Sequence, residues 1–196
     1  VLDLGANIEC NEKNLVDFSI MGTALFKSLF NIDCPKVALL NVGLEEIKGN
    51  DVLKKTFSLL KNSKSKNFDF SGYIEGSQIM DGDVDVIVTD GFTGNIALKT
   101  AEGTANFITK NLKKSLNKLS MLISYWPLKR FKEKLDPRKY NGAMFLGLQG
   151  SVVKSHGSTD AVGFANSIET CHKMVRSKLV EKIKTNLISL DDNSAQ

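Results

Sequence analysis

The segment VDVIVTDGFTGN (Val84–Asn95) joins a short apolar run to a turn that contains two glycines. The run is rich in β-branched residues, which predicts a buried strand, and a helix is expected to begin at Ile96. A strand that passes through a turn directly into a helix is the unit from which parallel α/β sheets are built. Ligands of such sheets bind beyond the carboxyl ends of the strands, so the turn is a candidate site.

The same alternation of strands and helices extends along the chain on both sides of this segment. The pattern predicts helices over 11–30, with Asn11 as N-cap, and over 50–61, after Asn95, and from Phe164 to Ile183. Strands are predicted over 36–43, 68–73, 84–90, 143–148 and 152–155. The apolar stripe of the last helix is Phe164, Ile168, Cys171, Val175, Leu179 and Ile183. The pattern indicates an α/β fold of three layers, α/β/α, with a mainly parallel sheet.

One domain over residues 1–190 accounts for this pattern, with a helical hairpin inserted at about 96–139 and a polar tail over 191–196. The opening VLDLGAN has the character of a buried strand ending in a glycine turn, so we expect the domain to be incomplete at its N-terminus. The chain has no signal-type start and no apolar run of the roughly 20 residues that cross a bilayer. Three scattered cysteines favour a reducing compartment over a disulfide framework, so we expect a cytoplasmic protein.

Positive charge is concentrated in the predicted hairpin. Between Lys110 and Lys139 there are ten basic residues and two acidic ones, whereas the whole chain has a net charge of only +4. The tip over 119–128 is almost wholly apolar, and its candidate contact residues are Leu122, Ile123, Tyr125 and Trp126. Such a tip fits either an interfacial anchor on anionic membrane or a dimer interface, and both interpretations stay open. The aromatic residues do not alternate with the lysines, so nucleic acid is not an expected partner.

Four turns at predicted strand ends combine glycine with Asn, Asp, Lys or His, over 2–7, 41–50, 89–95 and 154–158. Glycine lets backbone amides approach an anion closely, and a helix start adds a favourable dipole. Lys48 and His156 could add positive charge or donors, and Asn41, Asp90 and Asn95 could orient an oxyanion or a water. One such turn is ordinary, because these residues dominate turns for steric reasons. Four of them indicate a shared anion site, and neither a dinucleotide nor a P-loop glycine pattern is present.

The motifs LDLGAN, NVGLEEIKGN, DGFTGN, YNGAMFLGLQG and HGS, in this order, closely resemble the phosphate acyltransferases of bacterial phospholipid synthesis, the PlsX type. The resemblance covers Leu2 to about Ile168. Two positions depart from the family pattern, because Met144 and Gln149 stand where proline and asparagine are expected. The resemblance implies a fold akin to phosphotransacetylases and isocitrate-type dehydrogenases, a homodimer, and no metal or organic cofactor.

The resemblance also implies a reaction, the transfer of a long acyl group from acyl carrier protein to inorganic phosphate. Under this hypothesis the catalytic residues are Asn41, Lys48, Asp90 and His156. The residues that bind phosphate or substrate are Asn7, Gly43, Gly91, Thr93, Gly94, Asn95, Gly157 and Ser158. A covalent route through cysteine is the less favoured alternative, because Cys171 falls within the apolar stripe of a predicted helix and Cys34 lies in a predicted loop without a nearby histidine. Two rival functions are a short-chain phosphate acetyl- or butyryltransferase that uses acyl-CoA, and a noncatalytic membrane-binding partner.

Overall fold

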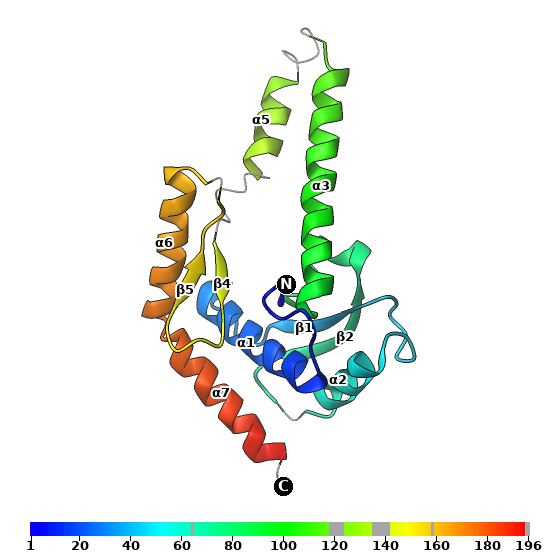
Figure 1. Cartoon of the computed structure of the whole chain (residues 1–196), viewed down its shortest axis with the longest axis vertical. Helices are drawn as coiled ribbons and strands as arrows, with labels where there is room; N and C mark the ends of the chain where they lie inside the picture. The colour runs from blue at the N-terminus through cyan, green and yellow to red at the C-terminus, as the bar shows by residue number, and fades with distance from the viewer. Residues whose placement is uncertain (64, 118–123, 135–141, 158, 195–196) are drawn as a thin grey trace.

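The computed structural model describes residues 1–63, 65–117, 124–134, 142–157 and 159–194 (Figure 1). Its helices are α1 (Glu12–Phe30), α2 (Asp51–Lys61), α3 (Gly91–Ser115), α5 (Tyr125–Lys134), α6 (Ala161–Arg176) and α7 (Leu179–Ser194), with a 3-10 turn η1 (Gly76–Gln78). Its strands are β1 (Lys36–Asn41), β2 (Asp69–Glu75), β3 (Val86–Val88), β4 (Ala143–Phe145) and β5 (Val152–Lys154).

Three strands form a parallel sheet in the order β2-β1-β3, which confirms the predicted open α/β fold. The chain start continues this sheet, because Leu2 forms a parallel bridge with Val88. The backbone N–H of Leu2 donates to Ile87 O at 2.9 Å, and Thr89 N–H donates to Leu2 O at 2.8 Å. Four segments therefore run in the same direction, and their carboxyl ends lie along one edge.

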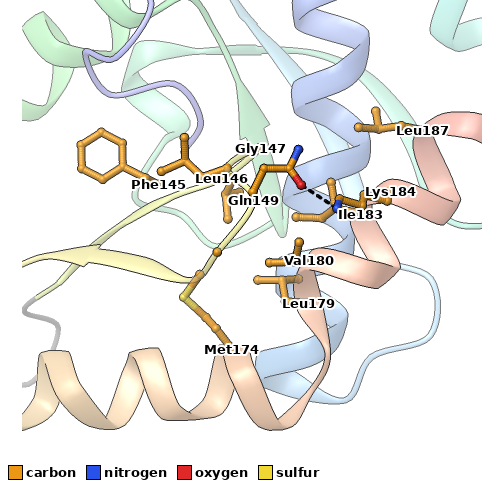
Figure 2. A pocket seen from close by; sticks show the side chains of 12 residues that line it. Phe145, Leu146, Gly147, Gln149, Met174, Leu179, Val180, Ile183, Lys184 and Leu187 are labelled. Atoms are coloured by element: carbon orange, nitrogen blue, oxygen red, sulfur yellow. Dashed lines mark hydrogen bonds between the residues drawn. The ribbon is translucent and has the colours of Figure 1, made fainter.

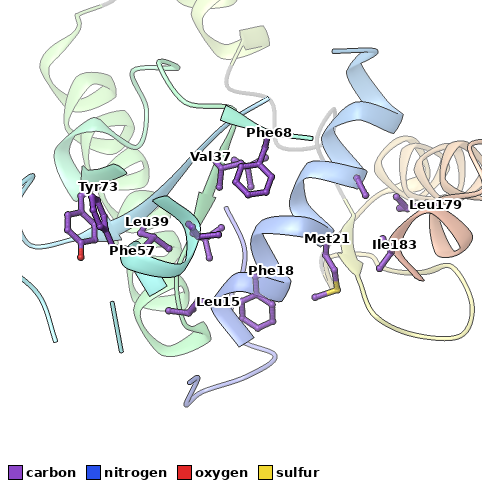
Figure 3. Packing of buried hydrophobic residues seen from close by; sticks show 14 of the residues in the cluster. Leu15, Phe18, Met21, Val37, Leu39, Phe57, Phe68, Tyr73, Leu179 and Ile183 are labelled. Atoms are coloured by element: carbon purple, nitrogen blue, oxygen red, sulfur yellow. The ribbon is translucent and has the colours of Figure 1, made fainter. Parts of the chain in front are cut away.

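Helix α1 lies at the centre of the molecule, between the parallel sheet and α7 (Figure 3). Asn11 begins it as predicted, because its side chain accepts a hydrogen bond from Asn14 N–H at 3.0 Å and the Asn14 side chain returns one. Leu15, Phe18 and Met21 of α1 belong to the main hydrophobic cluster, together with residues of β1 and α7. Burial on both sides of one helix therefore joins the sheet to the C-terminal part of the chain.

The C-terminal helix differs from the prediction in three ways. It consists of two helices, because Ser177 caps α6 and Lys178 takes a left-handed conformation with φ of 52°. On α6 the predicted stripe faces solvent, with Phe164 and Ile168 exposed by 54% and 57%. The buried residues of α6 are instead Gly163, Ser167 and Met174, and the two small ones allow close approach to neighbouring elements. Helix α7 runs to Ser194, into the predicted tail.

The late strands β4 and β5 form a separate two-stranded antiparallel sheet rather than joining the parallel one. Figure 1 shows this sheet beside α6, whereas α3 and α5 extend together away from the rest of the molecule. Helix α3 begins at Gly91 with Asp90 as its N-cap, not at Ile96 as predicted. Residues 91–95, which we expected to form a loop, are thus the first turn of this helix.

Candidate functional site

The candidate site lies at the carboxyl edge of the parallel sheet, where three of the four predicted turns begin. The turn after the Leu2 bridge starts with Asp3, the turn after β1 starts at Asn41, and Thr89 and Asp90 follow β3. Parallel strands place these residues on the same edge. The sheet topology thus brings together residues that are far apart in the sequence.

Asp3 organises the first turn. It is only 4% exposed, and its carboxylate accepts hydrogen bonds from Gly5 N–H, Ala6 N–H, and both the backbone and the side chain of Asn7, at 2.6 to 3.0 Å. Burial alone would raise the pKa of Asp3, but hydrogen bonds from Ala6, Asn7 and Gly5 outweigh it, so the pKa of this carboxyl is lowered. Asp3 therefore stays ionised and holds the turn in one conformation.

The first turn is fixed against the start of α3. Gly91 N–H donates to Asn7 O at 2.8 Å, and the Asn95 side chain donates to Leu4 O at 3.0 Å. Gly94 faces the backbone of Asp3 so closely that a Cβ at this position would overlap the Asp3 carbonyl oxygen. Glycine at 94 is therefore required by contact with a neighbouring segment, not by its own dihedral angles.

The amides at the start of α3 already have acceptors. Asp90 accepts from Thr93 N–H and from Thr93 Oγ1, both at 2.8 Å, and its backbone carbonyl accepts from Gly94 N–H at 2.9 Å. A carboxylate at an N-cap satisfies these donors and uses the favourable helix dipole. The amides of Gly91, Thr93 and Gly94 therefore donate to acceptors within the protein in this structure, and their role as donors to an anion stays a prediction.

A cavity of about 340 Å³ is lined by residues of the turns after β1 and β3 and by the segment that follows the first turn. Asp90 comes from the turn after β3, Asn50 from the end of the turn after β1, and Glu9 and Cys10 follow the first turn. Ile8, Leu15, Val52 and Leu53 complete its lining. Carboxylates beside apolar surface suit a ligand that is polar at one end. The sequence pattern did not identify Asn50 or Glu9 as candidate site residues.

Comparisons with known proteins agree with the motif resemblance. A family model described as fatty acid synthesis protein matches residues 1–182. The chain belongs to this family.

Several similar proteins carry the name phosphate acyltransferase. The protein of Pelagibacter ubique is 60% identical over 192 residues, which cover 95% of this chain and 58% of that protein. Those of Agrobacterium fabrum and Brucella canis are 45% and 44% identical over 192 residues each, covering 54% and 56% of their lengths. The chain therefore spans a little over half the length of these relatives.

In this family member, the turn after β1 is held by Asn41, whose side chain donates to Lys48 O at 3.2 Å and accepts from Val42 N–H at 2.9 Å. The Lys48 ammonium lies 3.0 Å from a Glu45 carboxylate oxygen, with both side chains about half exposed. A hydrogen bond with its own backbone, followed by the hydrogen bond and the charge of Lys48, lowers the pKa of Glu45. Gly43 leaves room for the Lys48 side chain, because a Cβ there would overlap it. Lys48 therefore lies in the turn after β1, and its ammonium is paired with the Glu45 carboxylate.

The fourth predicted turn follows a strand of the antiparallel sheet, not of the parallel one. His156 and Gly157 follow β5 in the antiparallel sheet, and both are exposed. The His156 carbonyl accepts from Thr159 N–H at 3.1 Å, which closes the turn before α6. Ser158 lies outside the described residues. The strand order does not bring this turn to the edge that carries Asp90, which the sequence pattern had suggested.

Cys10 lies before α1 and lines the cavity beside Asp90. Burial raises the pKa of the Cys10 thiol; a hydrogen bond with the Gly91 backbone opposes this, and the charges of Asp90 and Asp3 add to it. A raised pKa leaves less thiolate, so Cys10 is poorly suited to act as a nucleophile. Within the described part of the chain, no group of three His, Cys, Asp or Glu side chains is placed to hold a metal ion.

The described part of the hairpin exposes aromatic side chains. Tyr125 and Trp126 are exposed by 54% and 68%, and the Lys129 ammonium lies 5.6 Å from the Trp126 ring centroid. Phe107 and Ile108 of α3 are also exposed. Leu122 and Ile123 lie outside the described residues. Among the helices of the described ranges, none has the length and apolar character needed to cross a membrane.

Proposed function

We propose that this chain carries the phosphate site of an acyltransferase that converts acyl carrier protein bearing a long acyl chain, and inorganic phosphate, to acyl phosphate and free carrier protein. The acyl phosphate would feed phospholipid synthesis. The observation that supports this most is one cavity lined by residues of the turns after β1 and β3 and by the segment after the first turn, in a chain whose relatives are named phosphate acyltransferase.

The proposed chemistry needs no covalent enzyme intermediate. A phosphate oxygen attacks the thioester carbonyl carbon, the new C–O bond forms, and the C–S bond breaks. The hydrogen of the phosphate balances the departing thiolate, which leaves as the carrier thiol. Phosphate is a competent nucleophile near neutral pH, so the protein contributes mainly by holding the two reactants together and stabilising the oxyanion.

Asp90 has a defined part in this proposal. Thr93 holds both of its oxygens, and the carboxylate lines the cavity with lone pairs still available. A carboxylate repels a fully ionised phosphate but accepts a hydrogen bond from the O–H of hydrogen phosphate. Asp90 would therefore orient the monoprotonated ion, with Asn41 positioning the turn that carries Lys48.

Lys48 supplies the positive charge in this scheme, by leaving Glu45 for phosphate or for the oxyanion. An exposed ion pair stabilises its partners by at most about 1 kcal/mol, so an incoming dianion can compete with Glu45. We expect Lys48→Ala to lower kcat/KM for phosphate by about thirtyfold, since loss of a group that stabilises developing charge costs on the order of 2 kcal/mol or more. Steady-state kinetics with varied phosphate measures this.

Lys61 offers the matched control for this prediction. It is the last residue of α2 and is similarly exposed, and its ammonium lies 2.6 Å from a carboxylate oxygen of Glu46. Lys61→Ala should leave kcat/KM for phosphate within twofold of the parent. Equal effects of the two substitutions would mean that Lys48 contributes only to the overall charge.

His156 is the other proposed donor to phosphate or the oxyanion. Because its turn lies in the antiparallel sheet, its role requires that the turn approaches the cavity when substrate binds. We expect His156→Ala to lower kcat about tenfold, as for a lost hydrogen-bond donor in the transition state. His172→Ala, at an exposed position on α6, is the control. Turnover of His156→Ala within a few-fold of the parent removes His156 from the mechanism.

The basic hairpin would bring the enzyme to its substrates, by attracting the acidic carrier protein and the anionic membrane. We further propose a homodimer, for which the exposed face of α3 is a candidate surface. Trp126 supplies the membrane contact in this scheme, since aromatic rings favour the headgroup region and lysines meet anionic lipid.

Trp126→Glu is therefore expected to reduce binding to vesicles of anionic lipid at least fivefold, measured by flotation at low salt. Ile188→Glu, which changes an exposed apolar side chain on α7, should leave binding within about twofold. Unchanged flotation of Trp126→Glu would leave the dimer interface as the role of this surface.

A further inference from the structure

A second cavity, of about 220 Å³, lies between the loop that follows β4 and the helices α6 and α7 (Figure 2). Its walls are almost wholly apolar and come from Leu146, Leu148, Met174, Leu179, Ile183 and Leu187. In the described part of the chain, the residues that line it are all different from those that line the cavity beside Asp90. It is therefore a separate candidate site that the proposed acyl transfer does not use.

One wall of the cavity belongs to the hydrophobic core. Met174, Leu179 and Ile183 are 2%, 1% and 5% exposed and belong to the main core. The opposite wall passes close to α1 at Gly147, whose φ of 81° favours glycine and whose added Cβ would lie 3.4 Å from Met21 Sδ. A pocket formed between a packed core and a seated loop needs little reorganisation to bind a ligand.

One polar pair spans the cavity. Lys184 Nζ donates to Gln149 Oε1 at 2.7 Å, so an ammonium and an amide lie next to the apolar walls, as Figure 2 shows. No carboxylate side chain is among the described residues that line this cavity. The charge at the site is therefore positive, and it complements an anion that is joined to an apolar chain.

We infer that this cavity binds a fatty acyl chain at the end that carries an anionic head group. The apolar walls take the methylene groups, and Lys184 pairs with the head group while Gln149 turns its amide N–H toward it. The volume is below that of pockets for drug-sized ligands, so the site accommodates only part of a long chain. The choice of an acyl ligand rests on the proposed function, whereas the apolar lining and the lysine do not.

Direct titration tests this inference without reference to turnover. Straight-chain alkanoates, alkylphosphonates and alkanols of six to fourteen carbons are titrated into the chain by calorimetry, below their micelle concentrations. We expect affinity to rise about fourfold per methylene and then to level off when the cavity is full. A higher affinity for phosphonates than for carboxylates would identify acyl phosphate as the ligand, and the reverse order would identify free fatty acid.

Two substitutions distinguish the contribution of the lysine charge from that of the apolar walls. Lys184→Gln should weaken binding of the anionic ligands about three- to tenfold and leave the alkanols unchanged, because only the charge is removed. Leu148→Asn should weaken all three series, and Leu148 is 47% exposed, so its replacement does not open the core. The control is Ile188→Asn, on the same helix as Lys184 but outside the cavity and 62% exposed.

The inference is overturned if no series binds the parent, if affinity rises with chain length without a plateau, or if Ile188→Asn weakens binding as much as Leu148→Asn. Turnover of acyl carrier protein by a chain that binds none of these ligands would overturn it and leave the proposed function intact. Saturable binding by a chain without turnover would support it and count against the proposed function.

Discussion

Replacing Gly94 with alanine is expected to lower the free energy of unfolding by more than about 3 kcal/mol and to abolish acyl transfer, because the added methyl group meets backbone. A Cβ at this position would overlap the carbonyl oxygen of Asp3. The backbone of Asp3 is itself held in place, because its N–H donates to the carbonyl oxygen of Thr89, directly after β3, at 2.9 Å. Neither segment can yield without separating the first turn from α3. Urea unfolding measures the loss of stability.

Gly103 provides the control, because it lies in the same helix and an added Cβ there meets nothing within 4 Å. Gly103→Ala should raise the free energy of unfolding by about 0.5 to 1 kcal/mol, as expected for alanine in place of glycine within a helix. If Gly94→Ala were also neutral or stabilising, the close packing of α3 on the first turn would be wrong.

Replacing Asp3 with asparagine is expected to cost about 3 kcal/mol near neutral pH. The two carboxylate oxygens accept four hydrogen bonds, two at each oxygen. An amide can present an acceptor at only one of these positions, so its NH₂ group faces two donors, each of which is left unsatisfied. Asp33→Asn, at an exposed carboxylate, should change stability by less than about 0.5 kcal/mol.

The effect of Asp3 has a defined pH dependence. The folded-state pKa of Asp3 is lowered, so its contribution is fully present above the unfolded-state value of about 4 and is lost as pH falls through the folded-state pKa. The parent should therefore lose stability on acidification below about pH 4 more steeply than Asp3→Asn does. Parallel curves for the two proteins between pH 5 and pH 2.5 would contradict this assignment.

Local signals in the sequence were sufficient to predict the elements around the site. Asn11 caps α1 as the pattern predicted, since an N-cap acts through hydrogen bonds within one turn. Asn50, where the next helix was predicted to start, caps α2. The apolar, β-branched run over 36–43 likewise gave a buried strand. Helical periodicity did not predict the break at Lys178, because a single left-handed residue leaves no mark on apolar spacing.

Contacts between distant segments were harder to predict. Gly91 and Gly94 suggested a loop because glycine disfavours helix, yet both are needed inside α3 to admit the first turn. Asp3 was visible only as part of LDLGAN, and its four hydrogen bonds depend on the fold of that turn. The stripe of Phe164 and Ile168 on α6 shows the same limit, because amphipathicity identifies an apolar face but not whether anything covers it.

The proposed acyl transfer to phosphate takes place at the cavity that Glu9, Asn50 and Asp90 line. The most direct test measures release of the carrier thiol from long-chain acyl carrier protein, with and without inorganic phosphate, together with the acyl phosphate formed. We predict release that saturates with phosphate and equals the acyl phosphate produced. Thiol release that is absent, or that is the same without phosphate, would contradict the proposed function.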